Sequence, residues 1–302
     1  MKPPRPAKGQ TARTRPTPAA TPAARPGLGR GGSGAASRSG SGGNGAARGR
    51  RGAGRPSAPA PGALPPPGPS VAAARGPRVL ITAGPTHEPI DRVRFIGNRS
   101  SGKMGISIAQ AAAAAGWRVR LLLGPVPTPV NDPAVKVERF QTTEELRTLL
   151  TKRMPSTDVL VMAAAVADYR PDPADTDLSG KIRRKGQGLT LRLVSTPDLL
   201  QEAASGRRPG QVLVGFALEP RQGLEAVARA KLERKGVDFI VANPLETMDA
   251  ADIDGVLVGR DGATHSPGRR LSKGDFAAWL IARLTAEVGA GPRRRSPARG
   301  QA

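Results

Sequence analysis

The chain has 302 residues, a formal net charge of +23 and no cysteine. The absence of cysteine excludes disulfides, thiolate metal sites and a cysteine nucleophile, and it fits the reducing cytoplasm, where we expect this protein to work. The two histidines, His87 and His265, are too few for a multi-histidine metal site. Because the sequence has no apolar run of about 18 or more residues, it predicts no membrane-spanning segment.

The basic charge is concentrated at the two ends of the chain. Residues 1–75 contain 13 Lys and Arg with no Asp or Glu, and residues 289–302 add four Arg. Both segments have too few large apolar side chains to offset the loss of chain entropy on folding, so they are predicted to be disordered tails. Their arginines fit either plain solvated tails or weak, sequence-independent contact with nucleic-acid phosphates. The folded domain is expected to span residues 76–288.

Strand-like and helix-like segments alternate through this domain. In chain order the pattern predicts a strand at 78–83, a helix at 102–115, strands at 118–123 and 135–140, a helix at 143–152, a strand at 158–163, part of a hairpin at 189–194, a helix at 197–204, a strand at 212–216, a helix at 223–235, a strand at 238–242, a hairpin at 255–266 and a helix at 273–288. The alternation indicates a three-layer α/β fold. Its mostly parallel sheet would carry helices on both faces and a small C-terminal hairpin.

The segment Gly84–Gly105 (GPTHEPIDRVRFIGNRSSGKMG) connects the first strand to the first helix. Its SSG sequence predicts a helix start whose free backbone N–H groups and dipole attract an anion, unless one serine simply caps the helix. Arg94 and Asn98 are candidates to clamp a phosphate and to hydrogen-bond an amide. Arg94 equally fits a surface ion pair with Glu88 or Asp91.

The stretch Gly97–Lys103 also matches the G-x-x-x-x-G-K spacing of a P-loop. Met104 stands where that motif places the Ser or Thr that binds magnesium, and a long polar stretch precedes the loop in place of a strand. A P-loop NTPase is therefore disfavoured.

Three later segments are expected at the same edge of the sheet, because ligands bind beyond the carboxyl ends of parallel strands. Ala163–Arg170 (AAAVADYR) has small side chains that let a ligand approach the backbone, and Asp168 either accepts hydrogen bonds from a base or sugar or caps a turn. Lys181–Lys185 (KIRRK) is flanked by glycines and predicts either a flap that closes on phosphates or a solvated loop. Lys231 and Lys235 share a helix face and suit a polyphosphate, unless they are ordinary surface charges.

Together, these motifs resemble the phosphopantothenoylcysteine synthetase family of coenzyme A biosynthesis, in its bacterial CTP-dependent form. The resemblance covers residues 77–288 and implies a Rossmann-like fold and a homodimer. Nothing in residues 1–75 resembles the flavin-dependent decarboxylase domain that is often fused to this synthetase. The resemblance therefore implies that no FMN is bound and that a separate protein supplies decarboxylation. The residues on which the resemblance rests are the motifs above together with TPDLL, VGFALE, ARAKLERKGVDFIVAN and the segment 248–256.

The resemblance implies a ligation in two steps. The carboxylate of 4′-phosphopantothenate attacks the α-phosphate of CTP, giving an acyl-cytidylate and pyrophosphate. The amine of cysteine then displaces CMP and forms an amide. A carboxylate is a poor acyl donor, so the mixed anhydride supplies the leaving group. Catalysis would rest on positioning and on charge neutralisation by lysine and by the Mg²⁺ expected with CTP, for which no protein ligands are assigned.

Site roles follow from the resemblance residue by residue. Arg94 and Asn98 are expected to bind the phosphopantothenoyl part in a pocket lined by Ala165, and these two residues with Lys181 are the expected catalytic residues. Phe216, taken alone, also fits a plain core position. The expected nucleotide-binding residues are Met162, Ala163, Ala164, Asp168, Lys181, Pro197, Asp198, Leu199, Leu200, Phe216, Lys231 and Lys235.

Several positions depart from the family pattern. Arg183 and Arg184 replace two flap lysines, which keeps the charge and changes the hydrogen-bonding geometry. Ser195 and Pro220 stand where Lys and Thr are common. Asp254 replaces a common Asn near the C-terminal end of the site segments, so contacts from that last segment are not assigned.

One alternative of a different class is left open by the sequence. It is a non-catalytic nucleotide- or nucleic-acid-associated α/β protein in which the basic tails matter most. The joint presence of Asn98, Lys103, Asp168, Lys181 and the two helix lysines favours the ligase.

Overall fold

The computed structural model describes residues 76–184, 186 and 188–289. The predicted tails therefore lie outside the described residues, apart from Gly289, which ends the last helix. None of the helices in the described ranges is long and apolar enough to cross a membrane. The elements are β1 (Arg78–Ala83), β2 (His87–Pro89), β3 (Phe95–Gly97), α1 (Lys103–Ala114), β4 (Arg118–Leu123), β5 (Val135–Arg139), α2 (Thr143–Arg153), β6 (Val159–Met162), β7 (Tyr169–Pro171), β8 (Leu193–Ser195), α3 (Leu199–Ser205), β9 (Val212–Glu219), α4 (Leu224–Lys235), β10 (Phe239–Pro244), β11 (Asp252–Ile253), β12 (Val256–Gly259), β13 (Thr264–His265), β14 (Leu271–Ser272) and α5 (Lys273–Gly289).

An eight-stranded sheet forms the centre of the domain, in the order β13-β12-β10-β9-β6-β1-β4-β5. The six strands from β10 to β5 are parallel, and β12 and β13 add an antiparallel hairpin at one edge. The chain runs from β1 to β4 and β5 on one side and then returns to β6 on the other side of β1. This reversal of direction is where an open α/β sheet places its ligand. The predicted fold class is confirmed.

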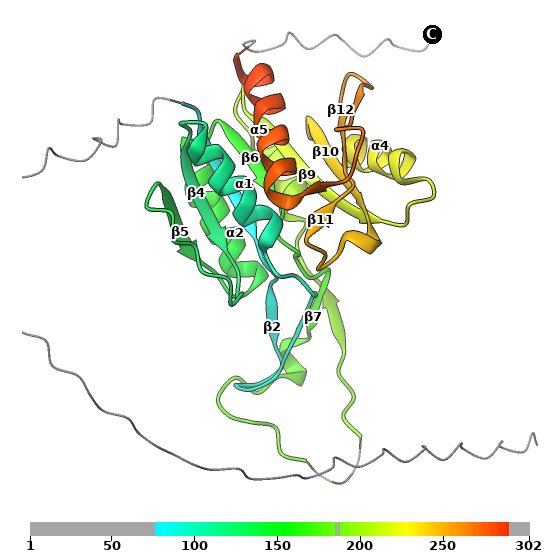
Figure 1. Cartoon of the computed structure of the whole chain (residues 1–302). Helices are drawn as coiled ribbons and strands as arrows, with labels where there is room; N and C mark the ends of the chain where they lie inside the picture. Colours follow the sequence, from blue (N-terminus) through cyan, green and yellow to red (C-terminus); the bar gives the residue numbers. More distant parts are fainter. Residues whose placement is uncertain (1–75, 185, 187, 290–302) are drawn as a thin grey trace, which may run out of the picture. The chain divides into compact units, whose positions relative to one another are not determined.

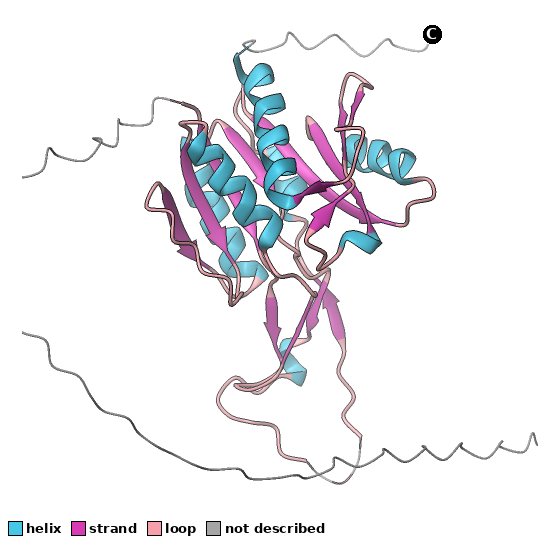
Figure 2. Cartoon of the chain, viewed as in Figure 1, coloured by secondary structure: helices cyan, strands magenta, loops and turns pink. Residues whose placement is uncertain are grey.

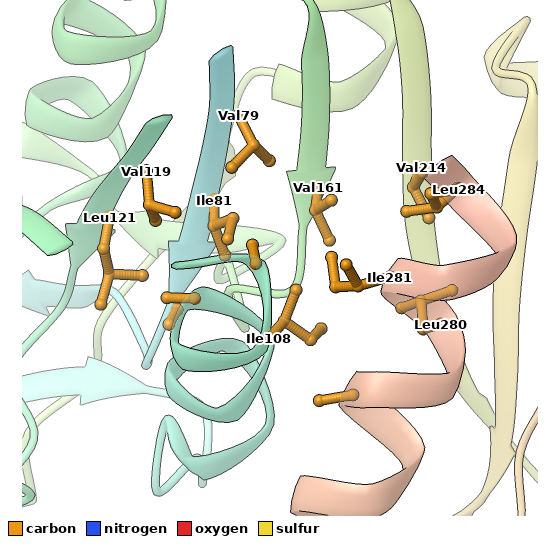
Figure 3. Close-up of a cluster of buried hydrophobic side chains, with 14 of the residues drawn as sticks. Val79, Ile81, Ile108, Val119, Leu121, Val161, Val214, Leu280, Ile281 and Leu284 are labelled. Carbon is orange, nitrogen blue, oxygen red and sulfur yellow. The ribbon is translucent and has the colours of Figure 1, made fainter. Parts of the chain in front are cut away.

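Helices cover both faces of the sheet (Figures 1 and 2). Alternate residues of β1 point to opposite sides, so Ile81 packs with α1 and α5, while Leu80 packs with α2, α3 and α4. The same alternation in β4, β6, β9 and β10 explains why these strands are near-continuous apolar runs. Figure 3 shows the first layer, in which Ile108 of α1 and Leu280 and Ile281 of α5 meet the inward side chains of four strands.

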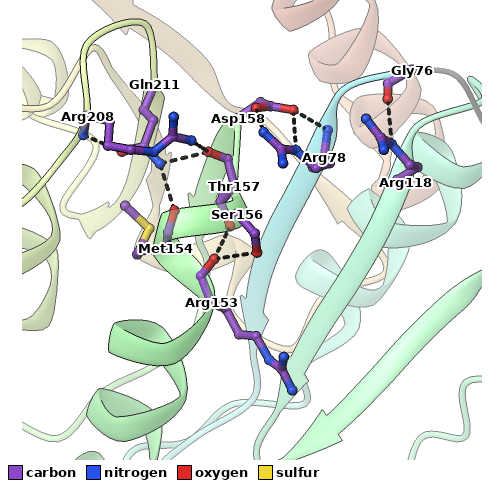
Figure 4. Close-up of polar contacts among 10 residues, drawn as sticks. All are labelled: Gly76, Arg78, Arg118, Arg153, Met154, Ser156, Thr157, Asp158, Arg208 and Gln211. Atoms are coloured by element: carbon purple, nitrogen blue, oxygen red, sulfur yellow. Dashed lines mark hydrogen bonds and ion pairs between the residues drawn. The ribbon is translucent and has the colours of Figure 1, made fainter.

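Polar groups tie together the ends of the strands that face away from the carboxyl edge (Figure 4). The guanidinium of Arg78 donates to both carboxylate oxygens of Asp158, at 3.0 and 2.6 Å. Gln211 donates to the carbonyls of Met154 and Thr157 at 2.8 and 2.7 Å. These bonds span the starts of β1, β6 and β9, so this end of the sheet is occupied by structural contacts.

Most predicted elements match the structure to within a few residues, including the terminal hairpin of β12 and β13. One expectation was partly wrong, since only Leu193 and Val194 of the expected 189–194 segment lie in a strand, β8, which extends to Ser195. It pairs with β7, which was not predicted. A second unpredicted pair joins β2 and β3. We call residues 87–97 and 169–195, which contain these four short strands, the arm. Figure 1 shows β2 and β7 side by side at the edge of the domain.

Candidate active site

A cavity of about 860 Å³ lies at the carboxyl ends of the central strands. Four predicted segments contribute to its wall: the loop before α1, the alanine-rich loop after β6, the segment that begins α3, and the lysine face of α4. Thirteen of the predicted site residues line it, which are Asn98, Met162, Ala163, Ala164, Ala165, Asp168, Pro197, Asp198, Leu199, Leu200, Phe216, Lys231 and Lys235. The cavity therefore brings together residues that are more than a hundred positions apart in the chain.

The start of α1 opens into this cavity without a serine cap. Gly102 is the residue that precedes the helix, in a left-handed conformation with φ of 70°, and no described side chain caps the helix there. Of the two alternatives that the sequence left open for these serines, the structure does not support the cap, because Gly102 occupies the capping position. Ser100 and Ser101 line the cavity with the first helical N–H groups, which is a favourable setting for an anion.

Close packing fixes this loop over the sheet. Gly105 in the first turn of α1 lies so near β1 that a Cβ atom there would be 2.5 Å from the Cβ of Ala83. Upstream of the loop, β3 belongs to the two-stranded arm pair and not to the central sheet. A P-loop follows a strand of the central sheet, so the structure agrees with the exclusion of that motif.

The side-chain amide of Asn98 donates to the carbonyl of Val166 at 2.9 Å. This bond joins the loop before α1 to the loop after β6. The second loop is also held by two buried threonines, since Thr82 accepts from the amide of Ala164 at 3.1 Å and Thr86 accepts from the amide of Ala167 at 3.0 Å. The alanine side chains leave this part of the wall shallow, so a bound molecule can reach the backbone.

The two lysines of α4 line another part of the cavity wall. The Nζ of Lys231 donates to the carbonyl of Phe216 at 2.8 Å, and Lys235 forms an ion pair with Asp198, the residue that caps α3. Burial lowers the pKa of both lysines, and the nearby carboxylate of Asp168 opposes that shift. Desolvated ammonium groups gain most from an incoming anion, so this wall suits phosphates.

Arg94 and Lys181 lie elsewhere. Neither is among the described residues that line the cavity, and both belong to the arm. Arg94 forms the ion pair with Asp91 that the sequence left open, and its Nη2 also donates to the carbonyl of Ile182 at 2.8 Å. The side chain of Lys181 is exposed. Within a single chain, the structure thus separates these two predicted catalytic residues from the other predicted site residues.

Sequence reasoning missed several residues of the cavity wall. Asn243, near the end of β10, and Thr247, just after that strand, are hydrogen-bonded to each other at 2.9 Å. Asp249 has a positive φ of 58° and forms an ion pair with Arg99 at 2.9 Å. Lys273 begins α5, and burial and the nearby Lys103 lower its pKa. The position of Asn243 after an apolar strand was a usable signal, whereas Lys273 reaches the cavity only through packing of α5.

The sequence of this domain matches a known protein family. Residues 74–288 match the model of the DNA/pantothenate metabolism flavoprotein C-terminal domain. The chain belongs to this family. A relative in the family, the coenzyme A biosynthesis bifunctional protein CoaBC of Mycobacterium tuberculosis, is 41% identical over 218 residues, covering 68% of this chain and 51% of the relative. The chain thus spans about half the length of the curated relatives it matches.

Two solved structures have the same fold as this domain. The C-terminal domain of CoaBC superimposes with a TM-score of 0.60 and 29% identity, covering 72% of this chain and 100% of that domain. A mutant of Cab2 in complex with phosphopantothenate-cysteine gives a TM-score of 0.60 at 19% identity, covering 72% of this chain and 88% of Cab2. The family match and the CoaBC relatives confirm the family resemblance drawn from the motifs.

Proposed function

We propose that this chain ligates 4′-phosphopantothenate to cysteine, with CTP as the activating nucleotide. Family membership supports the proposal, and so does the name of the CoaBC relatives, which places them in coenzyme A biosynthesis. The fold neighbour Cab2 was solved with phosphopantothenate-cysteine. The observation that carries the proposal is that one cavity is lined both by the segment expected to bind the acid and by the lysines expected to bind the nucleotide.

In the first step, the carboxylate of 4′-phosphopantothenate attacks the α-phosphate of CTP, and pyrophosphate leaves. We assign Asn98 and Ala165 to the acid side, where the Asn98 amide is already oriented by its bond to Val166. We assign Lys231 and Lys235 to the phosphates. Two anions must approach each other in this step, so fixed positive charge on one wall lowers the barrier more than it tightens substrate binding.

In the second step, the neutral amine of cysteine attacks the acyl carbon, CMP leaves, and the amine loses a proton as the amide forms. The shallow alanine wall after β6 leaves room for the amine beside the acyl group. An incoming phosphate also competes with Asp198 for Lys235, because Asp198 is already ion-paired with that lysine. Phosphate binding is then coupled to the start of α3, which Asp198 caps.

Magnesium is expected to enter with the nucleotide. No group of three or more His, Cys, Asp or Glu side chains that could hold a metal occurs in the part of the chain that the structure describes. Mg²⁺ commonly keeps several waters and binds through substrate phosphates together with one or two carboxylates. A site with one or two protein carboxylates is therefore sufficient for it. Asp168 is the candidate carboxylate, because it lies close enough to Lys231 and Lys235 for its charge to oppose the lowering of their pKa by burial. The metal would neutralise phosphate charge.

Pyrophosphate release tests the proposal. The full chain is mixed with 4′-phosphopantothenate, Mg²⁺ and either CTP or ATP, with and without cysteine, and the amide product is identified by mass spectrometry. We expect pyrophosphate with CTP and product only when cysteine is present. Release with ATP alone would overturn the choice of nucleotide. A folded protein that releases pyrophosphate with neither nucleotide would contradict the ligase and support the non-catalytic alternative.

We further propose that the chain works as a homodimer assembled through the arm. Six of the ten large apolar side chains exposed in the described ranges lie on the arm: Val93, Phe95, Tyr169, Leu178, Leu189 and Leu193. Exposed apolar side chains gathered on one projecting element are typical of an interface. The arm also carries Arg94 and Lys181, which lie outside the cavity of their own chain. In a dimer, they are free to complete the cavity of the second copy.

Two matched sets of substitutions test the proposed dimer. Val93→Asp combined with Leu178→Asp is expected to give a monomer in sedimentation velocity, with turnover lost and the far-UV circular dichroism unchanged, because both side chains are exposed in the single chain. Val227→Asp on α4 introduces the same charge at another exposed apolar position and should leave the dimer intact. An active monomer would show that the arm is not needed for the reaction.

A further inference from the structure

The carboxylate of Asp91 lies at the centre of a contact network in the arm. Its side chain is fully shielded from solvent. One oxygen accepts from the backbone amides of Val93 and Arg94, both at 2.8 Å. The other accepts from the guanidinium of Arg94, through Nε at 2.9 Å and through Nη2, and from the amide of Ile182 at 3.1 Å. A single carboxylate thus receives bonds from residues about ninety positions apart in the sequence.

The backbone on either side of Lys181 is fixed by the same network. The amide of Arg92 donates to the carbonyl of Gly180 at 3.0 Å, so the residue before Lys181 is held. The residue after it, Ile182, is held twice, because its amide binds Asp91 and its carbonyl accepts from Arg94 at 2.8 Å. Lys181 therefore sits between two anchored peptide groups, with only its side chain free to move.

The network also orients Arg94. Its contacts to Asp91 and Ile182 use Nε and Nη2, which form one edge of the planar guanidinium. Among the described residues, no hydrogen bond involves Nη1, so that part of the guanidinium remains available to an anion. The hydrogen bonds from Arg94 are the main cause that holds the pKa of Asp91 well below its usual range. The carboxylate is accordingly ionised throughout the pH range of an enzyme assay.

We propose that Asp91 is a positioning residue that holds Lys181 and Arg94 in one fixed arrangement at the base of the flap. The catalytic part of this inference rests on the proposed function, whereas the anchoring of Lys181 does not. A carboxylate that merely stabilised the turn at Val93 would need only its first oxygen. The second oxygen is directed at Arg94 and at the flap, which links the two cationic residues that the family resemblance assigns to catalysis.

Limited proteolysis tests the anchor without any need for activity. Trypsin cleaves after Lys181, and the peptide bond it must reach contains the amide that Asp91 holds. In Asp91→Asn the charge is lost, and we expect cleavage after Lys181 to accelerate about tenfold or more, as for local opening of a segment that loses a charged hydrogen bond. Cleavage after Arg183 and Arg184, which lie beyond the anchor, should change little. Fragments are quantified by mass spectrometry over time.

Asp175→Asn is the matched control. Asp175 also pairs with an arginine, since it accepts from the backbone and side chain of Arg192 at the other end of the flap. Its loss should speed cleavage after Arg192 and leave cleavage after Lys181 unchanged. If Asp91→Asn does not fold, Arg94→Gln replaces it, because that variant removes the bond to the carbonyl of Ile182 while keeping Asp91. Unchanged cleavage after Lys181 in a folded Asp91→Asn or Arg94→Gln protein would overturn the anchor.

Kinetics then test positioning. Asp91→Asn should lower kcat at least about tenfold with a smaller change in the KM for CTP, because the lysines that hold the phosphates lie outside the arm. In an Arg94→Gln background, the same substitution should cost much less, since the two residues act as a unit. Equal losses in both backgrounds would show a merely structural role. A wild-type chain without ligase activity would overturn the proposed function, yet the proteolysis result would still decide whether Asp91 anchors Lys181.

Discussion

Replacing Lys181 by glutamine is expected to lower turnover about a hundredfold or more, the scale seen when one donor to transition-state charge is removed. The melting temperature should stay within error of the wild type. The side chain is exposed, and within the described residues it forms no hydrogen bond or ion pair that stabilises the fold. Its backbone is held by its neighbours, which the substitution leaves in place. Glutamine keeps most of the length and polarity of lysine and removes the charge.

The measurement is pyrophosphate release under single-turnover conditions, accompanied by a thermal melt. Lys152→Gln provides the control, since Lys152 is an exposed lysine in the last turn of α2, away from both the cavity and the arm. That variant should keep full activity. If Lys181→Gln turned over as fast as the control, the side chain of Lys181 would have no part in the chemistry, and the mechanism would rest on the lysines of α4 and on Arg94.

Substituting Gly105 by alanine is expected to destabilise the protein by about 1–3 kcal/mol, as for other overpacked sites. The new Cβ would lie 2.5 Å from the Cβ of Ala83 and 3.0 Å from the carbonyl oxygen of Thr82, both on β1. These atoms belong to the central strand and cannot move aside, so α1 must shift. The loop before α1 lines the cavity, and the same shift should therefore weaken pyrophosphate release.

Gly274→Ala is the matched comparison, because it makes the same chemical change in the first turn of α5. An added Cβ there has 3.8 Å to its nearest neighbour, the hydroxyl of Ser272. With no clash, alanine should be neutral or should stabilise the helix by up to about 1 kcal/mol. Urea unfolding of the two variants measures the difference. A Gly105→Ala protein as stable as the wild type would mean that α1 is free to move away from β1.

The sequence predicted much of the site for a simple reason. Residues such as Asp168 lie in loops that follow buried strands, and the carboxyl ends of parallel strands meet at one edge. Any polar residue placed there is brought to the same cavity. The spacing of Lys231 and Lys235 was equally informative, since two residues one helical turn apart share a face. The structure places all of them on the wall of one cavity.

Other features could not be read from local pattern. The arm strands are only three residues long, and each is paired with a segment that local spacing does not reveal. Arg94 had two candidate partners in the sequence, and the structure selects Asp91 while Glu88 accepts from the hydroxyl and amide of Thr143 at the start of α2. The additional role of Asp91 as a partner of Ile182 depends on a contact across ninety residues and had no sequence signal.

By itself, the sequence determined the order of the long strands and helices, the parallel sheet and the edge at which ligands bind. The physical reason is that burial of a helix or strand on one face or on both gives its apolar residues a regular spacing along the chain. This spacing can be recognised without knowing which elements pack against each other. The tertiary structure alone decided which polar groups meet. It placed Lys273 in the cavity, left Arg94 and Lys181 on the arm, and joined those two through Asp91. Such contacts depend on hydrogen bonds between distant segments, for which the local pattern carries no information.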